Sequence, residues 1–225
     1  MKYEIIGGQL PAVVCKLDRG EKVFTESGGM CWMEEGFSMD SNTRGGLLKG
    51  LGRAMSGESI FLTTYTSSQD DAEIAFGSSF PGKILPVALE PGKTLIVQKH
   101  AFLAAEDGVN LQAHFRKKLG TGFFGGEGFV LQKLTGNGMA FLEIDGDIIE
   151  KTLAPGETLQ VDQGYIAGFE ESVQFDITTV KGLKNKFFSG EGLFLATLSG
   201  PGKIWLQTMP FSVLADRIIS LVPKG

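Results

Sequence analysis

Two histidines and two cysteines are the side chains best suited to metal binding or nucleophilic chemistry in this chain of 225 residues. His100 and His114 form no HxH pair, and Cys15 and Cys31 form no CxxC pair. A metal site needs several such ligands around one ion, and a serine or cysteine nucleophile needs a base in a recognisable triad or elbow motif. The sequence therefore predicts no metal or other cofactor and favours a protein that is not an enzyme.

Glutamates that follow a glycine occupy equivalent positions in three related segments of the chain, at Glu58, Glu127 and Glu191. A carboxylate at the entry to a strand can accept hydrogen bonds from turn N–H groups or pair with a nearby lysine or arginine. We interpret these three repeat carboxylates as structural. The alternative is that they converge on one binding site.

Each repeat carboxylate follows a segment in which basic, glycine and apolar residues are mixed. The candidate interaction residues in these segments are Lys49, Arg53, Lys117, Lys118, Phe123, Phe124, Lys184, Lys186, Phe187 and Phe188. On one face of the protein they would form a cationic and apolar patch that suits an anionic membrane surface or a protein partner. The alternative is that the phenylalanine pairs are core and the lysines are solvated flanks.

Composition narrows the choice of compartment and partner. The 42% hydrophobic content is typical of a globular protein, and the net charge of −5 gives no general attraction to nucleic acid. The N-terminus lacks the apolar core of a signal peptide, and no apolar run reaches the roughly 18 residues of a membrane span. We therefore expect a cytoplasmic protein for which nucleic acid is not the favoured partner.

An internal repeat in the sequence indicates which secondary-structure elements carry these residues. Residues 81–144 match residues 145–208 at 22 of 64 positions when the two segments are aligned without a gap. The matches are mainly glycines and alternating apolar residues. They include Pro91-Gly92 and Pro155-Gly156, which predict a turn that leads into a strand.

The repeat predicts an all-β chain of three related β-modules at about 1–80, 81–144 and 145–209, of which the first is the faintest. The connections between the modules are too short to be linkers, so we expect one fused unit. Apolar residues at spacings of three and four predict a short C-terminal helix over about 211–222. We expect this helix to cover an open core or sheet end.

Several segments taken together resemble a known family. They are Met1-Lys2-Tyr3-Glu4-Ile5, Gly45-Gly46-Leu47-Leu48-Lys49-Gly50-Leu51, Gly57-Glu58-Ser59, Phe124-Gly125-Gly126-Glu127-Gly128, Phe169-Glu170-Glu171-Ser172-Val173 and Ser189-Gly190-Glu191-Gly192. Over nearly its whole length the chain resembles the mitochondrial biogenesis family named after altered-inheritance-of-mitochondria protein 24. The resemblance implies a β-sandwich or β-helix-like fold similar to that of the tryptophan RNA-binding attenuation protein. It also implies homo-oligomers, such as a trimer, and no catalytic residues.

Two functional hypotheses follow from these observations. The leading one is a non-enzymatic scaffold or interaction protein that docks to a membrane surface or a protein partner through the basic and apolar segments. The alternative is a β-module that binds a small ligand or RNA on its sheet faces or at a subunit interface.

Overall fold

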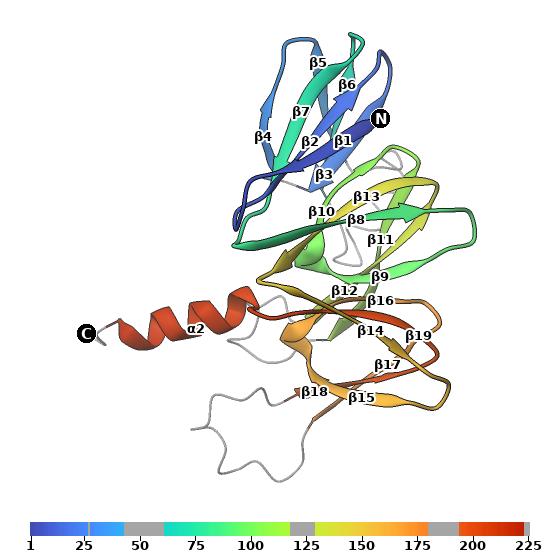
Figure 1. Ribbon diagram of the computed structural model, residues 1–225, viewed down its shortest axis with the longest axis vertical. Helices are drawn as coiled ribbons and strands as arrows, with labels where there is room; N and C mark the ends of the chain where they lie inside the picture. The colour runs from blue at the N-terminus through green and yellow to red at the C-terminus, as the bar shows by residue number, and fades with distance from the viewer. Residues whose placement is uncertain (27, 43–60, 118–128, 180–193, 223–225) are drawn as a thin grey trace.

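The protein consists almost entirely of antiparallel β-strands (Figure 1). The computed structural model describes residues 1–26, 28–42, 61–117, 129–179 and 194–222. Within these ranges it contains strands β1 to β19, two 3-10 helices and one α-helix, α2. The predicted all-β class is confirmed.

After β1 (Lys2–Ile6) the strands fall into three sets of six, which we call units 1, 2 and 3. Unit 1 comprises β2 (Ala12–Leu17), β3 (Lys22–Glu26), β4 (Met30–Met33), β5 (Phe37–Asn42), β6 (Leu62–Ser67) and β7 (Ala72–Gly77). Unit 2 comprises β8 (Gly82–Leu89), β9 (Leu95–Gln98), β10 (Phe102–Glu106), β11 (Val109–Lys117), β12 (Phe129–Gly136) and β13 (Gly138–Asp145). Unit 3 comprises β14 (Ile148–Leu153), β15 (Thr158–Asp162), β16 (Ile166–Glu170), β17 (Gln174–Thr179), β18 (Phe194–Ser199) and β19 (Gly202–Gln207).

The six strands pair in the same way in every unit. The first, sixth and third strands form one half-sheet, and the second, fifth and fourth strands form another. The third strand also carries a register shift at the same place each time, between Met30 and Trp32 in β4 and at the equivalent residues of β10 and β16. A bulge that recurs at an equivalent position is a feature of the unit rather than a local defect.

The units are joined because the third strand of one unit pairs with the second strand of the unit before it. β10 pairs with β3, and β16 pairs with β9. Each join merges two half-sheets into a six-stranded sheet, so four sheets are stacked from the N-terminal end to the C-terminal end (Figure 1). β1 pairs with β2 at one edge of the first sheet.

Three apolar cores fill the spaces between neighbouring sheets. Successive residues of a strand face opposite sides of its sheet, so the two six-stranded sheets contribute to a core on each face. In β3, Val23 belongs to the first core, together with Phe76, whereas Phe24 belongs to the second core, together with Leu142. The stacking of the units therefore buries both faces of the inner sheets.

A tight turn connects the first two strands of every unit. Gly20, Gly92 and Gly156 occupy the same turn position with φ of +84°, +86° and +81°. Glu157 N donates to Ala154 O across the third of these turns at 3.0 Å, and equivalent bonds close the other two. This is the glycine position of a type II turn, and the Pro-Gly pairs had predicted a turn at Gly92 and Gly156.

Helix α2 (Phe211–Leu221) confirms the predicted C-terminal helix but not its predicted location. Figure 1 shows the helix projecting from the side of the stack, and Ile218, Ile219 and Leu221 are 55%, 65% and 83% exposed. The expectation that it covers an open core or sheet end was wrong. Neighbouring sheets already cover the three cores, and the first helical turn is attached to the stack through an edge-to-face contact between Phe211 and Phe80. No helix in the described ranges is long and apolar enough to cross a membrane.

The turn glycines generate the first testable prediction. Gly156→Ala should lower the free energy of unfolding by about 1–2 kcal/mol, because a residue with a Cβ is strained at positive φ. Gly156→Asn should lose less, since asparagine tolerates this conformation. A Cβ at Gly156 or at Gly8 meets no atom within 4 Å, and only Gly156 has a positive φ. Gly8→Ala is therefore the control, and equal losses for both alanine variants in urea unfolding would contradict the prediction.

Candidate functional site

Most residues predicted to form an interaction site lie outside the described residues. This applies to Lys49, Arg53, Lys118, Phe123, Phe124, Lys184, Lys186, Phe187 and Phe188, and also to the repeat carboxylates Glu58, Glu127 and Glu191. Lys117 is the last residue of β11. Of the two histidines, His114 is exposed on β11, and His100 lines a pocket. The described residues include no group of three or more His, Cys, Asp or Glu side chains arranged to hold a metal ion.

A different glutamate proves to be the recurring carboxylate of the described fold. Glu34, Glu106 and Glu170 lie at or next to the end of the third strand of their units and accept a backbone N–H near the start of the sixth strand. The distances from Oε2 to the donor nitrogen are 2.9, 2.6 and 2.9 Å. These glutamates hold two strands of one half-sheet together. Their role is structural, because the same bond forms in all three units.

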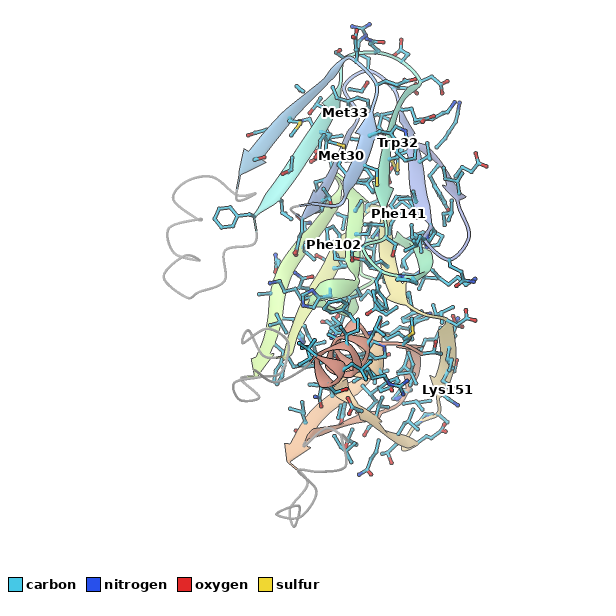
Figure 2. All side chains as sticks on the ribbon, turned by 90° about the vertical axis from the view of Figure 1, so that its left-hand side faces the viewer. Met30, Trp32, Met33, Phe102, Phe141 and Lys151 are labelled. Carbon is cyan, nitrogen blue, oxygen red and sulfur yellow. The ribbon has the colours of Figure 1, made fainter. Side chains whose placement is uncertain are left out.

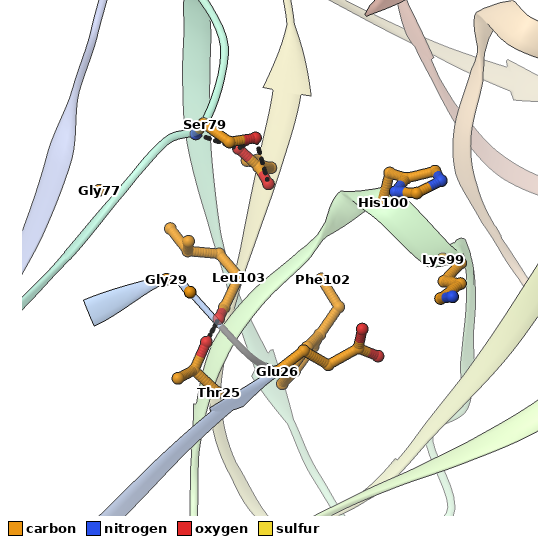
Figure 3. Close-up of a pocket in the computed structure, with 11 residues that line it drawn as sticks. Thr25, Glu26, Gly29, Gly77, Ser79, Lys99, His100, Phe102 and Leu103 are labelled. Carbon is orange, nitrogen blue, oxygen red and sulfur yellow. Dashed lines mark hydrogen bonds between the residues drawn. The ribbon is translucent and has the colours of Figure 1, made fainter. Parts of the chain in front are cut away.

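A pocket of about 190 Å³ lies at the junction between units 1 and 2 (Figure 3). Its polar lining comes from both sides of the junction. The residues are Thr25, Glu26 and Ser79 from unit 1 and the segment that follows it, and Lys99, His100 and Glu143 from unit 2. Lys99 and His100 belong to the 3-10 helix η1 (Lys99–Ala101), which connects β9 to β10. Two carboxylates, one lysine and one histidine thus meet in a small space.

The carboxylate of Glu143 is oriented by two consecutive serines. Ser79 donates its backbone N–H to Glu143 Oε2 at 2.7 Å, and Ser78 Oγ lies 3.0 Å from the same oxygen. Burial raises the pKa of Glu143, although the hydrogen bonds from Ser79 and Ser78 oppose this rise. The negative charge of Glu143 is therefore costly in the unliganded pocket, and a cation bound beside it would reduce that cost.

Glu26 is fixed from the neighbouring sheet. Its Oε1 accepts a hydrogen bond from Nε2 of Gln132, a buried residue of β12, at 2.6 Å. An acceptor held by a buried amide keeps its position without a ligand. Both carboxylates are thus held in place by the fold.

The equivalent junction between units 2 and 3 is occupied by amides. The repeat alignment places Gln98, Gln163 and Gln207 at the positions of Glu26, Lys99 and Glu143. All three glutamines are buried, and Gln207 Nε2 donates to Gly164 O at 2.8 Å and to Gln98 Oε1 at 3.3 Å. Three buried neutral amides, of which Gln98 and Gln207 bond to each other, occupy the second junction, whereas charged side chains line a pocket at the first.

Glycines also line the first junction. Gly28, Gly29 and Gly77 line the pocket, and the repeat alignment matches them with His100, Ala101 and Glu143 of unit 2. A Cβ at Gly77 would fall on Cys31 Sγ, and one at Gly29 would lie 2.6 Å from Thr25 Oγ1. The three glycines thus add no side chain to the lining of the pocket.

Sequence reasoning had not selected the pocket as a site. His100 was considered only as a metal ligand or a catalytic base, and Glu26, Lys99 and Glu143 are far apart along the chain. A signal was nevertheless present in the repeat. The alignment of 81–144 with 145–208 already shows Lys99 changing to Gln163 and Glu143 changing to Gln207.

Asp145 connects this region to helix α2. Its Oδ2 accepts the backbone N–H of Phe211, the first residue of the helix, at 2.8 Å. A carboxylate at a helix N-terminus satisfies an otherwise unpaired donor and interacts favourably with the helix dipole. Burial nevertheless raises the pKa of Asp145 to about 6, with a further contribution from the charge of Glu143, and the Phe211 N–H opposes the rise.

The raised pKa of Asp145 predicts how stability depends on pH. The folded chain binds more protons than the unfolded chain between the ordinary pKa of 3.8 and about 6, so this residue makes stability fall as pH rises through that range. In Asp145→Asn the amide oxygen can still accept the Phe211 N–H without a charge. The variant should therefore lose less stability than wild type between pH 4 and 7 in urea unfolding, whereas Glu4→Gln, on exposed β1, should follow wild type. Parallel pH profiles for wild type and Asp145→Asn would contradict the assignment.

Comparisons with known proteins agree with this architecture. Residues 3–209 match the family model described as mitochondrial biogenesis AIM24. The uncharacterized protein M6_Spy0233 of Streptococcus pyogenes serotype M6 is 29% identical, over 96% of this chain and 89% of that protein. The crystal structure of SPYM3_0169 from Streptococcus pyogenes superposes with a TM-score of 0.81 at 27% identity, covering 98% of this chain and 99% of the other. A family match that spans all three units shows that the chain belongs to the AIM24 family.

Proposed function

We propose that this AIM24-family protein is a non-enzymatic binding module that holds a small polar ligand in the pocket between units 1 and 2. The observation that carries the proposal is the difference between the two junctions of one chain. The unit needs no charge at this position, since Gln98, Gln163 and Gln207 build a closed and buried junction from the same strands. The same strands can thus join without charge at these positions, and binding of a polar ligand would account for the charged set Glu26, Lys99 and Glu143.

The charges of the pocket favour a zwitterionic ligand. A ligand ammonium group would reduce the cost of the buried Glu143 carboxylate, and a ligand carboxylate would suit Lys99 and His100. The volume of about 190 Å³ is below the roughly 300–1,000 Å³ of sites for drug-sized ligands. Free α-amino acids combine this charge pattern with this size. Two carboxylates repel a phosphate backbone, so the pocket favours a small ligand over RNA.

The proposal predicts thermal stabilisation that depends on the pocket charges. A free α-amino acid at about ten times its dissociation constant should add about 1.4 kcal/mol, which corresponds to a rise in Tm of about 3–6 °C for a chain of this size. The triple variant Glu26→Gln, Lys99→Gln, Glu143→Gln gives the first junction the side chains of the second. It should fold and lose the rise. The measurement is differential scanning fluorimetry of the full chain with each amino acid in turn.

A matched control removes the same charges elsewhere. Lys2→Gln, Glu4→Gln, Glu35→Gln changes one lysine and two glutamates at exposed positions, and it should respond to the amino acids as wild type does. Native mass spectrometry of wild type should show the added mass of the ligand. The proposal fails if no amino acid stabilises wild type, or if the triple pocket variant is stabilised to the same extent.

We also propose, as a second candidate, that the basic and apolar segments dock the protein to an anionic membrane surface. The observation that favours it is that these segments lie in the connections β5–β6, β11–β12 and β17–β18, which join the fourth and fifth strands of the three units. Equivalent connections bring three basic segments to equivalent positions of the repeat. The two free cysteines agree with a cytoplasmic setting for either function.

Membrane docking predicts sedimentation of the full chain with phosphatidylserine vesicles at low salt. Because the attraction is electrostatic, binding should weaken as salt is added and in the variant Lys117→Glu, Lys118→Glu, Lys184→Glu, Lys186→Glu. Vesicles of phosphatidylcholine are the neutral control. Equal sedimentation with both vesicle types, or none with phosphatidylserine at low salt, would reject this candidate.

A further inference from the structure

Two strands lack a neighbour that their counterparts have. The second strand of units 1 and 2 pairs with the following unit, and the third strand of units 2 and 3 pairs with the preceding unit. Within the described residues, β4 has only β7 as a neighbour, and β15 has only β18. We infer that β4 of one copy pairs with β15 of a second copy, so that chains assemble head to tail. This inference does not depend on the pocket.

The two junctions inside the chain specify the register of this pairing. In the first, Thr25 lies opposite Ala104 and Phe24 opposite Ala105, and the second junction has the same register at the equivalent residues. The repeat alignment transfers this register to the contact between two copies. Val161 of one copy then lies opposite Trp32 of the next, and Gln160 lies opposite Met33. We therefore propose that a second copy of this chain pairs with each free edge.

Backbone hydrogen-bonding groups point out of both edges at the required residues. Glu34 N donates to Glu73 O, and since alternate residues of a strand face opposite neighbours, the N–H and C=O of Met33 point away from β7. Gly200 N donates to Glu157 O, which by the same alternation turns the N–H and C=O of Gln160 away from β18. The outward groups are thus at Met33 and Gln160, the residues that the register places opposite each other.

The first strands of units 1 and 2 are less open to a second copy. β1 covers β2, the first strand of unit 1. Pro86 lies in β8, the first strand of unit 2. By the same alternation its backbone faces away from β13, and proline has no N–H to donate at that edge. In contrast, neither β4 nor β15 contains a proline. Among the edge strands of the described sheets, β4 and β15 therefore stand out, because their counterparts in the other units pair with a neighbouring unit, and they lie in the first and the last sheet of the stack.

The side chains permit this contact but limit its strength. Trp32 lies close to Met30 and Met33 (Figure 2) and is 41% exposed. Its Nε1 donates to Glu73 Oε1 of β7 at 3.0 Å, so the indole is directed toward β7 and not toward the open edge. The core residues Phe24 and Ile96 of the inner second strands correspond to the exposed polar Gln160 in β15. We therefore expect reversible association that depends on concentration, not a permanent oligomer.

Analytical ultracentrifugation of the full chain tests the inference. The weight-average mass of wild type should rise above the 24.2 kDa of one chain as concentration increases. Gln160→Pro removes the outward N–H without removing a bond to β18, so this variant should remain a monomer at every concentration. Thr152→Pro is the matched control, because Thr152 faces outward from β14, a first strand whose counterparts pair with no other unit. It should associate as wild type does.

A cross-link tests the same register without a proline. In a Cys31→Ser background, Met33→Cys with Gln160→Cys should form a ladder of covalent multimers under mild oxidation, since directly opposed strand residues meet disulfide geometry. The remaining native thiol, Cys15, is buried with its pKa raised to about 12, so it stays protonated and unreactive. Met33→Cys with Lys151→Cys, on another strand, should give no ladder. A wild type that stays monomeric at all concentrations, or a ladder from both pairs alike, overturns the inference.

Discussion

The pairing between the second strand of one unit and the third strand of the next is the interaction on which the rest of the structure depends. It merges half-sheets into six-stranded sheets and thereby determines which residues face two cores instead of one. Because the side-chain period of a strand is two, a shift of this pairing by one residue would turn Val23 and Phe24 to the wrong cores. The join therefore fixes the register, the order of the units and the location of each junction.

The same join explains why chemistry gathers at the junctions. The 3-10 helix that follows the second strand and the end of the sixth strand meet the preceding unit there, and side chains from distant parts of the chain come together. At the second junction Gln207 donates to Gln98 and to the Gly164 carbonyl, and this gives the buried amide partners. At the first junction, glycines leave space and charged side chains line it. One architecture thus produces a sealed interior in one place and a polar pocket in another.

Helix α2 illustrates how a local pattern can be right while its environment is misjudged. Its apolar spacing predicted a helix correctly, since that depends on neighbouring residues in the chain. Its location depends instead on Asp145 and Phe80, which receive the first helical turn through a backbone hydrogen bond and a ring contact. No periodicity in residues 211–222 contains that information.

The sequence by itself determined the features that are local or repeated. The all-β class, the C-terminal helix, the glycine turns at Gly20, Gly92 and Gly156 and the kinship with the AIM24 family follow from turn chemistry, alternation and self-similarity, all of which act over a few residues or one repeat. Only the tertiary structure decided that Glu34, Glu106 and Glu170 bond equivalent strands, and that Glu26, Lys99 and Glu143 share a pocket. It also decided which strand edges stay open, because strand order is set by contacts between units and not by the residues of any one strand. The physical reason is that a site made from two units exists only after their sheets have joined, whereas a turn or a helix exists wherever its own residues allow it.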